Sequence, residues 1–170
     1  MGHRLVLLRH AKSDWSTGLA DADRPLADRG RRQAPEAGRW LRSHLPGIDL
    51  AVVSPANRAR STWELVAAEL DDPPTARTVD DLYSYSAGPL LHVLRELPEE
   101  AGTVVVVGHN PALEELAELL TGELVPMPTS SLAVLEVDGA WAHLGADGAT
   151  LLAAGRPPST GSGRSGTQSR

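Results

Sequence analysis

The chain has 170 residues, which is enough for one domain with a sizeable hydrophobic core. It contains no cysteine, which excludes disulfides, thiol catalysis and cysteine-ligated metal sites. Residues 1–155 carry all 22 acidic but only 13 of the 16 basic side chains, and this excess of acid disfavours a general nucleic-acid binder, which needs a basic face.

Membrane association is not expected from the sequence. No stretch is long and apolar enough to span a bilayer. The apolar run near the N-terminus is too short for a secretory signal and leads directly into Arg9-His10. We therefore expect a cytoplasmic protein.

Strand-like and helix-like segments alternate along the chain. Strands are predicted at 3–8, 49–53, 103–107 and 132–137, with weaker candidates near 75–79 and 149–153. Helices are predicted between them, over about 28–45, after Ser54-Pro55, near 88–97 and from Asn110-Pro111 to Gly122. This order predicts an α/β fold, a three-layer α/β/α sandwich with a mainly parallel central sheet.

The pattern also makes three more detailed predictions, about two helix starts and the end of the domain. Pro35 falls inside the helix over 28–45, where a proline costs about 3 kcal/mol, so we expect that helix to start late or to kink. Ser54 is expected to cap the next helix, with Pro55 as its first residue. From Arg156 onward no apolar anchor remains, which predicts one domain over 1–155 and a disordered tail over 156–170.

Two predicted strands end in a histidine. Leu5 to Leu8 leads into Arg9-His10, and Val104 to Val107 leads through Gly108 into His109. Open α/β sheets place their ligand sites at the carboxyl ends of parallel strands. Two histidines at this edge, with arginines nearby, suit attack on a phosphoryl group.

The residue types match what phosphoryl transfer needs. The transferred group spreads negative charge over three oxygens, and arginine grips two oxygens at once while staying protonated. Arg9 follows the first strand and Arg58 lies one turn into the helix after the second. A neutral His10 can attack phosphorus through one ring nitrogen while the other donates to a backbone carbonyl. A protonated His109 would be a further donor.

A metal site built from His10 and His109 is an alternative interpretation of the same residues. It is disfavoured because no carboxylate lies at a ligand spacing beside them.

Four motifs occur in order along residues 3–153. They are Leu8-Arg9-His10-Ala11-Lys12-Ser13-Asp14-Trp15, Arg24-Pro25-Leu26-Ala27-Asp28-Arg29-Gly30, Ser54-Pro55-Ala56-Asn57-Arg58-Ala59 and Gly108-His109-Asn110-Pro111. Together they resemble the histidine phosphatase superfamily, also called phosphoglycerate mutase-like, and more narrowly its small bacterial SixA-type phosphohistidine phosphatases.

The resemblance implies a role for each matching position. His10 would become phosphohistidine, and Arg9, Arg58 and His109 would complete the phosphate pocket. Ser13 and Asp14 would touch substrate, and with Lys12 they are candidates for contacts with a partner. Leu26 and Gly30 would serve structure. No metal or other cofactor is implied.

The residue that protonates the leaving group stays open. Asp80 and Asp81 lie near the part of the chain where other branches carry an acid, but the usual long insertion is missing, and we favour a role in ending a strand and solvating a turn. A site without an acid fits a phosphoramidate, whose imidazole leaving group departs with less help than an alkoxide.

The predicted function is therefore a metal-independent phosphatase that acts on a phosphorylated protein, such as a phosphotransfer domain. Two alternatives remain. One is a phosphatase for small phosphomonoesters or sugar phosphates, and the other is a phosphate-binding module without turnover.

Overall fold

The predicted alternation of strands and helices is present in the computed structural model, which describes residues 2–158. The strands are β1 (His3–Arg9), β2 (Leu50–Val53), β3 (Thr75–Thr78), β4 (Thr103–Gly108), β5 (Leu132–Val137) and β6 (Ala149–Gly155). The α-helices are α1 (Asp28–His44), α2 (Asn57–Ala67), α3 (Ala87–Arg95) and α4 (Ala112–Thr121). Short 3-10 helices form at η1 (Asp21–Asp23), η2 (Asp80–Leu82) and η3 (Trp141–His143).

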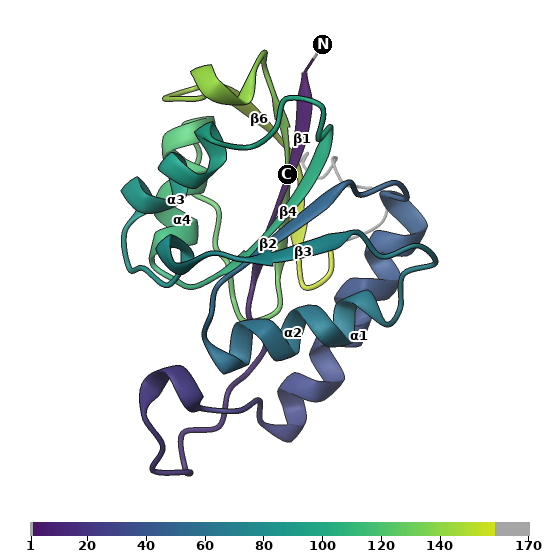
Figure 1. The fold of residues 1–170 in the computed structure, drawn as a ribbon, viewed down its shortest axis with the longest axis vertical. Helices are drawn as coiled ribbons and strands as arrows, with labels where there is room; N and C mark the ends of the chain where they lie inside the picture. The colour runs from purple at the N-terminus through teal and green to yellow at the C-terminus, as the bar shows by residue number, and fades with distance from the viewer. Residues whose placement is uncertain (1, 159–170) are drawn as a thin grey trace, which may run out of the picture.

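The strands form one six-stranded sheet in the order β3-β2-β4-β1-β5-β6. Strands β3, β2, β4 and β1 run parallel, β5 runs antiparallel to β1, and β6 runs antiparallel to β5. Helices α1 and α2 lie on one side of this sheet and α3 and α4 on the other (Figure 1). The predicted three-layer α/β/α sandwich with a mainly parallel sheet is confirmed.

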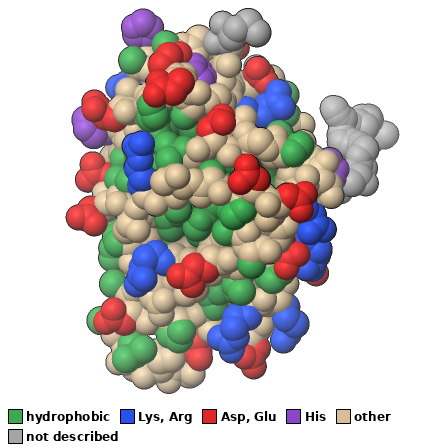
Figure 2. Space-filling view, turned by 45° about the vertical axis from the view of Figure 1, so that its right-hand side comes forward, with side chains coloured by type: hydrophobic (Ala, Val, Ile, Leu, Met, Phe, Trp, Pro, Cys, Tyr) green, Lys and Arg blue, Asp and Glu red, His purple; other side chains and the backbone are tan. Residues whose placement is uncertain are grey.

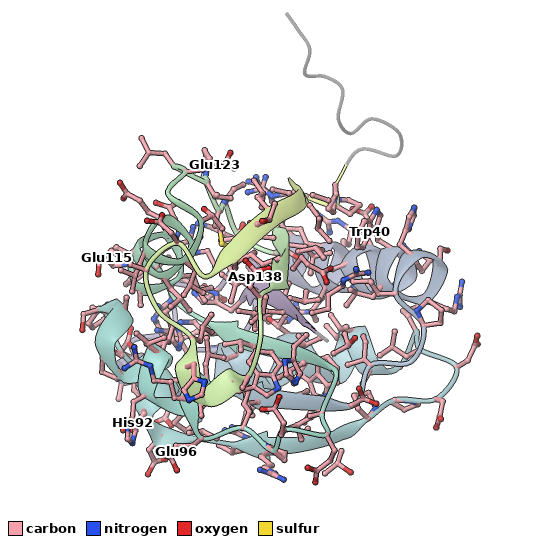
Figure 3. All side chains as sticks on the ribbon, turned by 90° about the horizontal axis from the view of Figure 1, so that it is seen from above. Trp40, His92, Glu96, Glu115, Glu123 and Asp138 are labelled. Atoms are coloured by element: carbon pink, nitrogen blue, oxygen red, sulfur yellow. The ribbon has the colours of Figure 1, made fainter. Side chains whose placement is uncertain are left out.

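Alternating side chains of the strands build two separate cores. Leu5 and Leu7 of β1 pack in the core under α3 and α4, whereas Val6 packs in the core under α1 and α2. Figure 3 shows the same layering from above, with Trp40 of α1 and Glu115 of α4 on opposite sides of the sheet. Both faces of the sheet are covered, which explains why its central strands read as continuous apolar runs.

The sheet changes its winding direction between β1 and β4. These strands are neighbours, but β1 continues toward α1 on one face and β4 continues into α4 on the other. A crevice forms at the carboxyl ends of strands where successive helices part in this way, and ligands bind there in open α/β sheets. The two histidine-bearing strand ends therefore meet at the place where this architecture favours a site.

The first predicted helix starts at residue 28 as the pattern indicates and not late, whereas the predicted start of the next helix is wrong. Helix α1 begins at Asp28 and runs through Pro35 without interruption. Pro35 leaves the carbonyl of Arg31, four residues earlier, without its helical amide partner, and the helix continues despite this loss. Helix α2 begins at Asn57 with Ala56 at its N-cap and no side-chain cap. Ser54 does not cap this helix because its hydroxyl is engaged inside the site described below.

The residues expected to serve structure hold the segment after His10 against α1. Leu26 is buried and forms an isolated bridge with Ser13. A Cβ at Gly30 would lie 2.1 Å from the carbonyl oxygen of Lys12. Only glycine therefore allows the first turn of α1 to touch this segment.

The predicted tail begins where β6 ends, at Gly155. Arg156 donates from Nε to the carbonyl oxygen of Thr129 at 2.7 Å, and Gly155 forms a bridge with Pro158. Arg156 and Pro158, which fall in the predicted tail, therefore contact the domain. The rest of that prediction falls on residues 159–170, which lie outside the described residues.

Acidic and basic side chains are interspersed on the face shown in Figure 2, without an area dominated by one sign. Within residues 2–158, no helix combines the length and the apolar character that crossing a bilayer requires.

Candidate active site

His10 and His109 lie side by side at the carboxyl edge of the sheet. Arg9 of β1 pairs with Gly108 of β4, and the N–H of His10 donates to the carbonyl oxygen of Gly108 at 3.1 Å. The centroids of the two imidazole rings are 5.1 Å apart, and both side chains are buried. The pairing of β1 with β4 thus brings together two histidines that are 99 positions apart in the sequence.

One ring nitrogen of His10 is engaged and the other keeps its lone pair. Nδ1 lies 2.8 Å from the carbonyl oxygen of Ala11, which can only accept, so Nδ1 carries the proton. Burial lowers the pKa of His10 to about 3, and the nearby His109 and Arg58 act in the same direction. The imidazole is therefore neutral at neutral pH, with Nε2 in the form that attacks phosphorus.

One cleft is lined by three guanidinium groups and both imidazoles, from Arg9, Arg24, Arg58, His10 and His109. Among residues 2–158, no hydrogen-bond partner reaches Nε of Arg9, Nε of Arg58 or Nδ1 of His109, although all three atoms are buried. Buried polar groups are normally paired. The arginines and histidines that line the cleft bring positive charge and several N–H donors together, so the cleft suits an anion with several acceptor oxygens, such as a phosphoryl group.

Ser54 is a site residue that the sequence interpretation assigned to a helix cap. Its hydroxyl is fully buried and lies 2.7 Å from Nε2 of His109. The same oxygen accepts the N–H of Ala56 at 3.2 Å. Ser54 therefore fixes the orientation of the His109 ring through Nε2, whereas Nδ1 has no partner among residues 2–158. Burial lowers the pKa of His109 to about 4.

Asp21 is a second site residue that the sequence interpretation missed. Its carboxylate accepts from Arg24 through Oδ1 and from Arg58 through Oδ2 at 3.0 Å, and its carbonyl oxygen accepts from Nη1 of Arg58 at 2.7 Å. The Tyr83 hydroxyl also donates to Oδ2. The hydrogen bond from Tyr83, followed by those from the arginines, lowers the pKa of Asp21 to about 2. Asp21 is therefore an anion that orients two arginines.

The residues just after His10 divide between the cleft and the surface. Ser13 is buried in the cleft wall and its hydroxyl accepts from Nη1 of Arg24 at 2.6 Å. Lys12 also lines the cleft. Asp14 does not line it, because its carboxylate turns to Ser16 and accepts from the backbone N–H at 2.8 Å.

The two carboxylates considered as proton donors lie away from the cleft. Asp80 and Asp81 are exposed on η2, and Asp81 lines a different surface hollow beside His92 and Val93. Their place agrees with the favoured role in ending a strand and solvating a turn. In the described part of the chain, no three His, Asp or Glu side chains gather closely enough to hold a metal ion.

The low pKa values of His10 and His109 predict that acid destabilises the fold. An unfolded imidazole binds a proton below its ordinary pKa of 6.5, whereas the two buried ones stay neutral down to about 3 and 4. The free energy of unfolding is therefore not reduced by these two histidines above pH 6.5. It falls as the pH decreases toward 4, by about 1.4 kcal/mol per pH unit for each histidine.

Urea unfolding at a series of pH values checks this prediction. His10→Gln, which cannot titrate, should show a shallower loss of stability between pH 6.5 and 4 than the unmodified chain. Identical slopes in the two proteins would contradict the buried neutral state of His10.

Comparisons with known proteins agree with this geometry. A family model described as the histidine phosphatase superfamily (branch 1) matches residues 5–90. Phosphohistidine phosphatase SixA of Escherichia coli K12 is 30% identical over 139 residues, which cover 79% of this chain and 86% of the relative.

Two solved structures share the fold over most of their length. The putative phosphohistidine phosphatase SixA from Nakamurella multipartitia superposes with a TM-score of 0.83 and 33% identity, covering 91% of this chain and 96% of the other. A protein histidine phosphatase SixA complexed with tungstate gives a TM-score of 0.77 and 25% identity, covering 89% and 95%. The chain therefore belongs to the histidine phosphatase superfamily, and it is a phosphatase.

Proposed function

We propose that the protein removes the phosphoryl group from phosphohistidine on a partner protein, through a phosphorylated His10 and without a metal ion. The observation that carries this proposal is the state of Asp21. Among the described residues that line the cleft, Asp21 is the one carboxylate, and its pKa of about 2 keeps it ionised. The cleft therefore has no carboxylic acid ready to protonate a leaving group.

In the first step, Nε2 of His10 attacks phosphorus and the bond from phosphorus to the substrate imidazole breaks. The bonding pair returns to the substrate nitrogen, whose ring leaves as neutral imidazole because its second nitrogen already carries a proton. In phospho-His10 the proton stays on Nδ1, which continues to donate to the carbonyl oxygen of Ala11. No proton has to come from the cleft in this step.

In the second step, water attacks phospho-His10 and releases inorganic phosphate. The leaving group is now the imidazole of His10, so both steps expel the same chemical group. An alkoxide is far more basic and needs a proton as it leaves. A site that already hydrolyses its own phosphohistidine without an acid therefore suits phosphohistidine substrates better than phosphate esters.

The remaining cleft residues stabilise the negative charge of the phosphoryl oxygens. Arg9 and Arg58 supply fixed positive charge, and the Nδ1-protonated tautomer of His109 would supply a further donor. Ser54 is a positioning residue whose hydroxyl engages Nε2 of His109 and fixes the orientation of the ring. One similar SixA structure was solved in complex with tungstate, which like phosphate is a tetrahedral oxyanion, and this supports binding of a phosphoryl group in the cleft.

The preference for a phosphorus–nitrogen bond is directly measurable. The purified protein should dephosphorylate a phosphorylated histidine phosphotransfer domain with a kcat/KM at least about a hundredfold above that for glycerol phosphate and sugar phosphates, since each factor of ten reflects about 1.4 kcal/mol of transition-state stabilisation. Phosphate release is measured for all substrates under the same conditions, with EDTA present.

Faster turnover of the esters would overturn the choice of substrate and favour a small-molecule phosphatase. The absence of hydrolysis on every substrate, together with tight phosphate binding, would favour a binding module instead.

A further inference from the structure

The cleft has a buried floor and an exposed rim. His10, His109 and Arg58 form its floor and are 7%, 2% and 3% exposed. Trp15 and Tyr85 line the same cleft but are 72% and 62% exposed. A leaving group attached to a phosphoryl group at the floor has its way to solvent through the rim, which Trp15 and Tyr85 help to form.

The Trp15 ring is held in place although it is exposed. The Arg24 guanidinium lies 3.6 Å from the centroid of the ring and covers one of its faces. Asp14, the residue before Trp15, donates its backbone N–H to the carbonyl oxygen of Pro25 at 2.9 Å, which fixes the backbone next to the ring. An aromatic ring fixed on one face and open on the other offers its open face to a ligand.

We propose that Trp15 and Tyr85 determine specificity by packing against the imidazole ring of the substrate phosphohistidine and the protein surface around it. This inference rests on the proposed function and adds which side chains recognise the leaving group. Planar rings pack well against one another. The chain itself holds such a pair, because Trp40 and His44 stack with centroids 4.4 Å apart and planes 11° from parallel.

The chemistry of the rim fits a protein better than a small hydrophilic substrate. Tryptophan and tyrosine bury much apolar area at little cost in side-chain entropy and are enriched at the centres of protein interfaces. Leu19, four residues after Trp15, adds another exposed apolar side chain in the same segment. A sugar phosphate would place hydroxyl groups against these apolar surfaces.

A pair of substrates separates recognition of the ring from the chemistry at phosphorus. Phosphoramidate has the same phosphorus–nitrogen bond as phosphohistidine but no ring and no protein. Trp15→Ala and Tyr85→Ala should each lower kcat/KM for the phosphorylated phosphotransfer domain by about tenfold, the scale of a lost aromatic contact. Their kcat/KM for phosphoramidate should stay within about twofold of the unmodified enzyme. Trp15→Phe keeps a ring and should recover most of the loss.

Leu124→Ala is a matched control, because Leu124 is 80% exposed and lines a hollow away from this cleft. It should leave both substrates unaffected. Equal losses on the two substrates would overturn the inference, since Trp15 would then act by positioning Arg24. Unchanged kcat/KM for the phosphotransfer domain would overturn it as well. Failure of the unmodified enzyme to hydrolyse either substrate would instead overturn the proposed function.

Discussion

Replacing His10 with alanine is expected to abolish turnover while leaving the fold intact. His10 offers an Nε2 lone pair at the floor of the cleft, whereas Nε2 of the neighbouring His109 is occupied by Ser54. No second imidazole is therefore ready to attack in its place. Loss of a nucleophile lowers kcat by about 10⁴-fold or more in hydrolases that form a covalent intermediate.

The fold should tolerate this change. The His10 side chain makes one hydrogen bond, to Ala11, and its removal opens space into a cleft rather than a cavity in either core. Circular dichroism and the melting temperature should stay close to those of the unmodified protein. His92→Ala is a suitable control, because His92 of α3 is exposed and lines a hollow other than this cleft. Residual activity of His10→Ala above a few per cent would show that another group receives the phosphoryl group.

Arg58→Ala is expected to lower kcat/KM by about 10²- to 10³-fold, the usual effect of losing one preorganised donor to transition-state charge. Its guanidinium is 3% exposed and is fixed by two hydrogen bonds to Asp21, with Nε left unpaired. The group is therefore held in place before substrate arrives and needs little reorganisation. Arg58→Lys keeps the charge but loses the planar fork, so it should recover only part of the activity.

A neighbouring arginine provides the control for this loss. Arg60 lies on the same helix, is exposed and donates to the carbonyl oxygen of Pro55. Arg60→Ala should change kcat/KM by less than about twofold, as exposed substitutions away from a site usually do. Equal activities of Arg58→Ala and Arg60→Ala would contradict a role of Arg58 in stabilising the transition state.

The strands and the meeting of His10 with His109 were predictable because they depend on simple periodicity. Apolar runs define buried parallel strands, and the carboxyl ends of such strands share one edge of the sheet. Arg58 follows from the same reasoning, since it lies at the start of the helix after a neighbouring strand. These predictions needed no knowledge of which loops lie close together.

Asp21 and the hydrogen bond of Ser54 depend on information that periodicity does not contain. Asp21 reaches the cleft because the segment between β1 and α1 folds back over it, and such a loop leaves no repeating pattern in a sequence. Ser54 contacts His109 because β2 and β4 pair with Val53 opposite Val107. The register between strands far apart in the chain is fixed by packing, so a residue typical of a helix cap turned out to belong to the site.

Pro35 is a case in which tertiary packing outweighs a low helix propensity. The cost of one interior proline is about 3 kcal/mol, but Ala34, Gly38 and Leu41 on the same helix are buried against the rest of the core. Packing along the whole of α1 outweighs the local penalty. Tertiary contacts therefore explain both the uninterrupted α1 and the failure of Ser54 to cap α2.

The most direct measurement asks which residue carries the phosphoryl group during turnover. The enzyme is mixed with phosphoramidate, denatured within milliseconds in alkali, where phosphohistidine survives, and digested for mass spectrometry. Phosphate is expected on the peptide that contains His10, and it should be missing from the same peptide of His10→Ala. Phosphate on the His109 peptide, or turnover of substrate without any phosphorylated enzyme, would contradict catalysis through His10.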